Sequence, residues 1–322
     1  MLYLLLKVLS AVGMGLVLKR ADARLLERLP LIRTNYAVAA VIGFFASVAL
    51  NQTHISNQTA LLAAVTGVLF VAGLLIWVRA IQAAGLALSI VAMRTAVVIP
   101  VFAAALIWHE NPSMLEIAGS FVALLALALV LYDVAKRETP VGDETTAKAK
   151  PDVTTKTQRH KGTEGGDMTT SDSPLTTHSS LVWLLLLFLA DGLVMIPALV
   201  FRKELPLNET MPFQTIIFVA AFAITSLLYY LRRPRLDPET LKWGAMLGTA
   251  NFGNYLFLVL ALTALPGLVV YPVIAAGEVG LLAIAGVVLW KEKVGVRGWL
   301  GIALAVIAIV LIQFGKAARI PV

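Results

Sequence analysis

Residues 268 to 290 read LVVYPVIAAGEVGLLAIAGVVLW, and this stretch carries a single charged side chain, Glu278, near its middle. An α-helix rises 1.5 Å per residue and the hydrocarbon of a bilayer is about 30 Å thick, so about 20 consecutive apolar residues cross it. The stretch is therefore long enough to span a membrane as one helix. A carboxylate at that depth is costly, which makes Glu278 a candidate functional residue.

The whole chain has the same apolar character. It contains 322 residues, of which 59% are hydrophobic and 14% charged, with a mean hydropathy of +0.86. Soluble domains carry about 25% charged residues, so the composition excludes a soluble globule and predicts an all-α membrane protein. Apolar runs bounded by charge, Pro or Gly predict ten transmembrane helices. We expect these helices near residues 1–18, 31–50, 60–81, 86–108, 113–132, 180–200, 212–231, 241–263, 268–290 and 296–314.

A polar segment divides these helices into two groups of five. Residues 133–179 are rich in Thr, Ser, Lys, Asp and Glu and contain no long apolar run. Such a composition does not bury enough apolar surface to compensate for the entropy of ordering, which predicts a disordered linker. The predicted organisation is a first five-helix repeat over residues 1–132, the linker, and a second five-helix repeat over residues 180–322.

The two halves match each other at a constant offset. Trp108 and Trp290 each begin a W-x-E sequence and lie 182 residues apart (290 minus 108). The same offset pairs Arg20 with Arg202 and also aligns Pro, Phe and Gly positions elsewhere in the halves, without a gap. This pattern indicates a duplicated unit. It also favours a retained first helix over a signal peptide, because the N-terminal segment has a counterpart in the second half.

Because a unit of five helices is odd, its second copy enters the membrane in the opposite sense. Basic residues support this inversion. Loop 19–33 holds five Lys or Arg and its counterpart 201–215 holds two, whereas loop 51–59 holds none and its counterpart 232–242 holds four. Once the second half is inverted, the basic loops fall on one side, as the positive-inside rule requires. This arrangement predicts a cytoplasmic linker with both termini on the other side.

The segment from Ala83 to Gly119, with Gly85, Pro100 and Glu110 around an apolar run, resembles the closing signature of an EamA-like repeat of the drug/metabolite transporter superfamily. The segment from 251 to 301 is similar to that family as well. It holds N-x-x-N-Y at 251–255, Leu265-Pro266-Gly267, Val270-Tyr271-Pro272, Trp290-Lys291-Glu292 and Gly301. The resemblance implies a bundle of two inverted five-helix repeats that moves small solutes by alternating access around a central cavity. It names no particular solute.

Ionisable side chains inside apolar helices are the strongest candidates for a site. Arg94 and Glu278 fall on equivalent helices, two positions from exact counterparts, so an inverted repeat would bring them face to face. They would either contact or gate a solute, or form a structural salt bridge that joins the halves. Asp191 lies midway along the sixth predicted helix. A buried carboxyl can exchange protons near neutral pH, so Asp191 is the candidate for proton coupling.

Polar side chains on the eighth and ninth predicted helices extend this candidate site. Asn251, Asn254 and Tyr255 are spaced i, i+3, i+4 and therefore share one helix face, and Tyr271 lies seven residues before Glu278. These groups would line a cavity with Tyr271, or the amides would simply bond neighbouring helices. By contrast, Lys7 is near the N-terminus, and we expect its side chain to reach water.

No enzyme motif accompanies these residues. The chain has no Cys, which excludes thiolate metal ligands and a nucleophilic thiol, and it lacks zincin, nucleophile-elbow and P-loop patterns. The formal net charge of +7 comes from clusters beside apolar runs, which argues for membrane topology and against nucleic-acid binding. We therefore expect no enzyme, no cofactor and no metal.

The predicted function is transport of a small organic solute across a bacterial inner (plasma) membrane, with protons as a candidate coupling ion. The alternative is a non-transporting scaffold or lipid-handling membrane protein that retains the fold. A sealed midplane would favour that alternative, and a polar cavity would favour transport.

Overall fold

The computed structural model describes residues 2–24, 26–84, 86–138, 177–291 and 295–317, and all regular structure within these ranges is helical. The elements in chain order are α1 (Leu2–Ala23), α2 (Arg28–Ala49), α3 (Asn57–Ala84), α4 (Leu86–Thr95), α5 (Val98–Leu106), α6 (Met114–Glu138), α7 (Thr177–Glu204), the short 3₁₀ helix η1 (Leu207–Glu209), α8 (Thr210–Arg232), α9 (Pro238–Ala264), α10 (Gly267–Trp290) and α11 (Val296–Ala317).

Seven of the described helical segments are long and apolar enough to cross a membrane, which makes the chain a multi-pass helical membrane protein. They lie in α1, α2, α3, α7, η1 with α8, α9 and α10. Three shorter apolar segments, Ala92–Leu106, Met114–Leu129 and Val296–Leu311, coincide with the other three predicted spans. Large apolar side chains such as Phe45, Phe121 and Leu231 are exposed on the outside of the bundle, as expected for surfaces that face lipid.

One predicted helix, 86–108, is interrupted. It forms α4 and α5, with a turn at Ala96 and Val97. Pro100 explains the break, because it has no N–H to donate and its ring clashes with the carbonyl four residues earlier, that of Ala96. The Ala96 carbonyl instead accepts a hydrogen bond from the Ile99 N–H at 3.0 Å. Pro197 and Pro272, by contrast, lie inside α7 and α10 without ending them.

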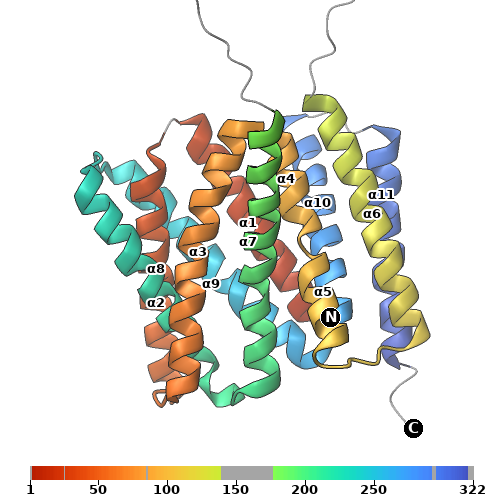
Figure 1. Cartoon of the computed structure of the whole chain (residues 1–322), viewed down its shortest axis with the longest axis horizontal. Coiled ribbons are helices and arrows are strands. Elements are labelled where there is room, and N and C mark those ends of the chain that lie inside the picture. Colours follow the sequence, from red (N-terminus) through yellow and green to blue (C-terminus); the bar gives the residue numbers. More distant parts are fainter. Residues whose placement is uncertain (1, 25, 85, 139–176, 292–294, 318–322) are drawn as a thin grey trace, which may run out of the picture.

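The loops gather at two ends of the bundle (Figure 1). The basic end, at the top of the figure, carries the connections α1–α2, α8–α9 and α10–α11, and α6 ends and α7 begins there. The far end, at the bottom, carries residues 50–56, 107–113, 205–209 and 265–266. The described residues that flank the predicted linker lie at the basic end. The linker's first residues continue α6 to Glu138 and its last belong to α7, while residues 139–176 lie outside the described residues.

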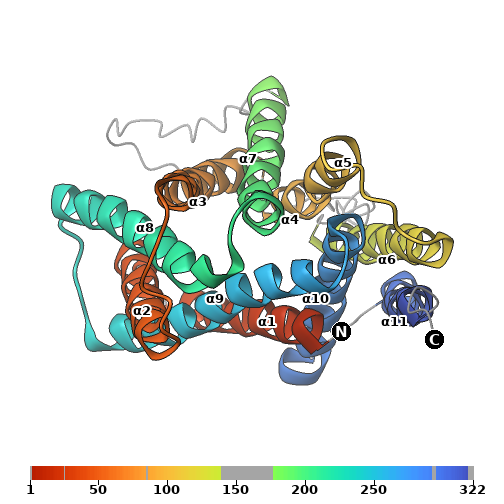
Figure 2. The same cartoon turned by 90° about the horizontal axis from the view of Figure 1, so that it is seen from below.

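Helices of the two halves pack against each other along most of the bundle. α1 packs on α9, α3 on α7, α2 on both α8 and α9, α3 on α8, and α6 on α11 (Figure 2). Small residues permit the closest approaches. A Cβ added at Gly248 of α9 would lie 2.5 Å from the Asn35 carbonyl oxygen of α2, and one at Gly67 of α3 would lie 2.6 Å from the Ile217 carbonyl oxygen of α8. Such glycine contacts are typical of tight packing between membrane helices.

The two W-x-E sequences share an unusual backbone conformation. His109 and Lys291, the middle residues of the two sequences, have φ angles of 45° and 56°. Left-handed backbone is uncommon for residues other than Gly, and here it follows the end of α5 and of α10. Glu292 lies outside the described residues.

Candidate functional site

A cavity of about 340 Å³ lies between helices of both halves. This volume is at the lower end of the range of ligand pockets, about 300–1,000 Å³. Residues from α1, α3, α4, α7, α9 and α10 form its walls. The walls comprise Lys7, Ala11, Met14, Gly15, Leu18, Phe70, Trp77, Met93, Arg94, Val97, Asp191, Val194, Met195, Asn254, Tyr255, Leu258, Tyr271, Ile274, Ala275, Glu278 and Leu282. Most are apolar, and the charged groups are concentrated in one cluster.

The charged cluster is centred on Glu278 of α10. Its Oε1 accepts a hydrogen bond from Nζ of Lys7 on α1, and its Oε2 accepts one from Nη1 of Arg94 on α4. The side chains of Glu278 and Lys7 are only 4% and 10% exposed, whereas that of Arg94 is 23% exposed. One carboxylate thus joins two first-half helices to a second-half helix. Burial makes these charge interactions stronger than they would be in water.

Asp191 of α7 lines the same cavity and interacts electrostatically with Arg94, Glu278 and Lys7. Two basic and two acidic side chains therefore share the space. The cluster is neutral when both carboxyl groups are ionised and carries one positive charge when Asp191 is protonated. A proton on Asp191 would accordingly change the charge that the cavity presents to a ligand.

Three polar atoms in the cavity wall are buried and have no hydrogen-bond partner among the described residues. They are Nε1 of Trp77, Oδ1 of Asn254 and the hydroxyl of Tyr255. Buried polar groups are nearly always paired, by protein, water or a ligand, and leaving one unpaired costs about 1–3 kcal/mol. The cavity thus offers a donor, an acceptor and a hydroxyl to a bound molecule, beside the apolar surfaces of Phe70 and Met93.

The other predicted site residues differ in position. Tyr271 lines the cavity, and its hydroxyl donates to the Met195 carbonyl oxygen at 3.0 Å. Asn251 does not line it, because its Nδ2 donates to Oδ1 of Asn35 at 3.2 Å and joins α9 to α2. For Asn251 the structure therefore follows the helix-bonding alternative, while its neighbours Asn254 and Tyr255 face the cavity.

The prediction for Lys7 is wrong. Its side chain does not reach water and is instead bonded to Glu278 inside the bundle. The reason is that α1 begins well above the lower edge of the bundle, so a residue early in the sequence is already deep (Figure 1). The sequence did carry a signal for this role: Lys7 is the only charged residue before Lys19, and it shares a helix face with Ala11, Met14 and Leu18.

At the far end, Glu110 ties three helix ends together. Its Oε2 accepts the N–H of Leu268 in the first turn of α10 at 3.0 Å, and Nζ of Lys203, near the end of α7, lies 2.8 Å from its Oε1. The Glu110 side chain is 4% exposed. Beside it, Nε1 of Trp108 donates to Oε1 of Glu204 at 2.6 Å. The second half is thereby joined to the α5–α6 loop of the first half.

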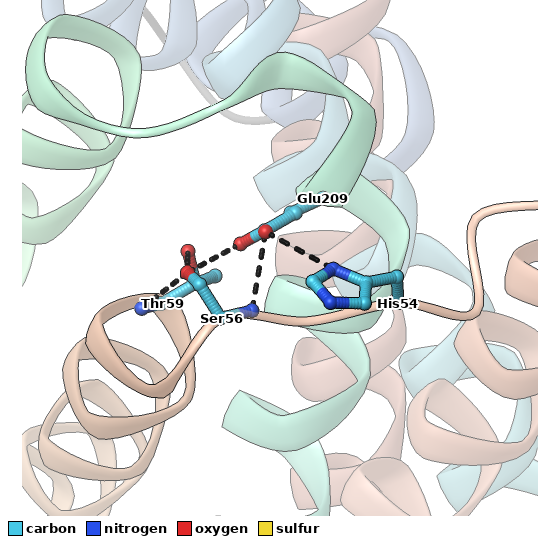
Figure 3. Close-up of polar contacts among 4 residues, drawn as sticks. All are labelled: His54, Ser56, Thr59 and Glu209. Atoms are coloured by element: carbon cyan, nitrogen blue, oxygen red, sulfur yellow. Dashed lines mark hydrogen bonds and ion pairs between the residues drawn. The ribbon is translucent and has the colours of Figure 1, made fainter.

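A second polar cluster at the far end also connects the halves (Figure 3). Glu209 of η1 accepts hydrogen bonds from the N–H of Ser56 at 3.1 Å and from its hydroxyl at 2.9 Å. Nδ1 of the exposed His54 lies 3.7 Å from Glu209. The far end is therefore held by several contacts that cross between the halves.

Within the described residues, no group of three or more His, Asp or Glu side chains is placed to hold a metal ion.

Comparisons with known proteins bear on the fold. No protein family model matches the chain. An uncharacterized protein from Haemophilus influenzae is 22% identical over 320 residues, which is 97% of each chain. A solved structure, described only as the crystal structure of a protein, aligns with a TM-score of 0.68 at 14% identity over 99% of this chain and 98% of the other. The helical arrangement as a whole is therefore similar to one seen in a solved structure.

Proposed function

We propose that this chain is a secondary active transporter of a small organic metabolite or drug-like solute, that it works by alternating access, and that proton-coupled export is its transport mode. The observation that carries the proposal is the central cavity. It combines a buried charged cluster with three unpartnered polar atoms, and its walls come from both halves of the chain. A membrane protein that only needed a stable core would fill such a space with apolar side chains.

Two inverted five-helix repeats form part of the proposal, and the packing supports them. The 182-residue offset converts the α1–α9 pair into the α7–α3 pair and the α2–α9 pair into the α8–α3 pair, and all four pairs are in contact. α1 runs toward the basic end while α7 runs away from it (Figure 1). The shared left-handed backbone at His109 and Lys291 adds a local correspondence. Inverted repeats with a site at their interface are a recurrent design for alternating access.

The charged cluster suggests how a proton gradient would be used. Protonation of Asp191 leaves the cluster with a net positive charge and disfavours a cationic group of the solute, whereas deprotonation favours it. The proton and the solute then compete for the cavity, as export in exchange for protons requires. Binding of the solute and binding of the proton are then linked, and the linkage is reciprocal.

The solute would be small and amphipathic. Trp77, Asn254 and Tyr255 would pair with its polar groups, and Phe70, Tyr271 and the Met side chains of the wall would cover its apolar part. The membrane would be the inner (plasma) membrane of a bacterium, which fits the similarity to a Haemophilus influenzae protein.

A scaffold or lipid-handling function is the second candidate. One observation favours it: Arg94 and Glu278 pair directly, as a structural salt bridge between the halves would. The cavity next to that pair and its unpartnered polar atoms favour transport instead.

Flux through the purified protein tests the proposal. Proteoliposomes would be screened with radiolabelled amino acids, sugars, nucleosides and cationic drugs, with and without an imposed proton gradient. We expect at least one class to cross faster than in protein-free vesicles, and we expect Arg94→Met to abolish this flux. Arg24→Met is the matched control, because Arg24 pairs with Glu239 at the basic end and its side chain is 51% exposed. Flux equal to that of empty vesicles for every class would support the scaffold function.

A further inference from the structure

The far end of the bundle has polar contacts of a kind that can close the cavity and be broken again. Glu110 of the α5–α6 loop contacts both α7 and α10, through Lys203 and the N–H of Leu268. These helices are cavity walls, since α7 supplies Asp191 and α10 supplies Glu278. We propose that the Glu110–Lys203 ion pair, supported by the Trp108–Glu204 hydrogen bond, is the gate that keeps the cavity closed at the far end. The inference rests on the proposed transport function.

The position of Glu110 suits a gate because one side chain controls the ends of two walls. Its Oε2 accepts from the N–H of Leu268, an amide of the first turn of α10 that has no partner within its own helix. The positive end of the α10 dipole is therefore neutralised by a residue of the other half. Displacing the α5–α6 loop would free the ends of both α7 and α10.

The bonds that hold this end are also of the type that can be remade. A carboxylate that is paired with a lysine and hydrogen-bonded to a backbone amide loses an ion pair and a charge-assisted hydrogen bond when it separates, yet each partner can be solvated by water at a helix end. Tightly packed apolar side chains would make a more permanent seal. The left-handed His109 next to Glu110 fixes the direction of the loop, so the gate closes in one defined geometry.

A substitution of Glu110 can separate its ion pair with Lys203 from its hydrogen bond with the Leu268 N–H. Glu110→Gln keeps an oxygen that can accept from the Leu268 N–H but loses the ion pair with Lys203. Arg24→Gln is a matched control, because the Arg24–Glu239 ion pair also joins the two halves but lies at the basic end.

Because the chain contains no cysteine, a single introduced cysteine is the only thiol to be labelled, and its labelling rate reports access to the cavity. A single Ala275→Cys reporter in the cavity wall would be labelled with a membrane-impermeant maleimide in spheroplasts and in inverted membrane vesicles, which expose opposite faces. We expect labelling from the basic end and slow labelling from the far end. Glu110→Gln should raise the far-end rate about tenfold, the change that about 1.4 kcal/mol produces, and Arg24→Gln should leave it unchanged.

Each outcome decides a separate claim. An equal far-end rate with and without Glu110→Gln, with normal labelling from the basic end, would overturn the gate and leave the transport proposal standing. No labelling from either face would show that water does not reach the cavity, and both proposals would fall. An unchanged basic-end rate in Glu110→Gln would show that the variant is folded. An equal increase in Arg24→Gln would overturn the gate, because any cross-half ion pair would then have the same effect.

Discussion

Replacing Glu278 with Gln should be among the most destabilising single changes available in this protein. The Glu278 carboxylate is 4% exposed and is the shared partner of Lys7 and Arg94. An amide has nearly the same shape but no charge, so Glu278→Gln leaves two cations inside an apolar bundle without their common counter-ion. Asp191 is the remaining carboxyl of the cavity and can compensate for only one of them.

The magnitude follows from the burial of the cluster. Removing one member of a buried ion pair typically costs about 3–5 kcal/mol, because the desolvated partner charge is left uncompensated. Lys7→Met should cost much less, roughly 1–2 kcal/mol, since Glu278 keeps Arg94 and a costly buried cation is removed at the same time. The double variant Lys7→Met/Glu278→Gln should recover about 1 kcal/mol or more relative to additivity, because the two residues are in direct contact.

Thermal unfolding in detergent micelles, followed by circular dichroism at pH 7, measures these differences. At about 2 °C per kcal/mol for a chain of this size, Glu278→Gln should lower Tm by roughly 6–10 °C and Lys7→Met by roughly 2–4 °C. A Glu278→Gln protein that melts within 1–2 °C of the wild type would refute the reasoning, because a Tm shift of that size corresponds to a loss of stability of only about 1 kcal/mol. It would be refuted equally by strict additivity in the double variant.

Three further predictions test other parts of the structure. Gly67→Val should prevent the close approach of α3 to α8, where an added Cβ would lie 2.6 Å from the Ile217 carbonyl oxygen, and we expect loss of monodisperse protein in size-exclusion chromatography. Asp191→Asn should keep the fold but remove the dependence of solute flux on an imposed pH gradient, and flux in that variant that still follows the gradient would exclude Asp191 from coupling. The hydrogen bonds from Thr240 hold the pKa of Asp237, the N-cap of α9, below its usual value. This cap therefore stabilises α9 above about pH 4 and is lost as the pH falls through the lowered pKa; the protection of the Thr240 amide against exchange, relative to its intrinsic rate at each pH, should fall on acidification in the wild type and show no such step in Asp237→Asn.

Much of the fold could be predicted because the bilayer imposes a simple rule on the sequence. A helix in hydrocarbon satisfies its own backbone groups and needs an apolar exterior, so apolar runs mark its limits within a few residues. The pairing of Arg94 with Glu278 was also predictable. The 182-residue sequence offset placed them on corresponding helices, and a buried charge requires a partner.

The features that were missed depend on three-dimensional placement. Lys7 is six residues from the N-terminus, and a distance along the chain does not reveal that α1 starts inside the bundle. Pro100, Pro197 and Pro272 were all expected to interrupt helices, but only Pro100 ends one, at Ala96, and the sequence does not distinguish it from the two that are accommodated. Asn251 and Asn254 are both asparagines on nearly the same helix face, and only the position of Asn35 on α2 decides which of them faces the cavity.

The charged residues of the cavity break the internal repeat, and this bears on why they exist. At the 182-residue offset, Glu278 corresponds to Ala96, Arg94 to Ala276, Lys7 to Leu189 and Asp191 to Leu9. Each charge thus has an apolar counterpart, whereas features that serve packing and turns, such as the W-x-E sequences and their left-handed residues, occur in both halves.

If the charges served only to join the halves, the apolar side chains that occupy the equivalent positions would do so at lower desolvation cost. A site for a solute without twofold symmetry, coupled to a single proton, needs charges on one side only. The asymmetry of the cluster thus favours the proposed transport function over a purely structural role. An exchange of Asp191 and Leu9, which preserves composition, should accordingly abolish flux even where the protein still folds.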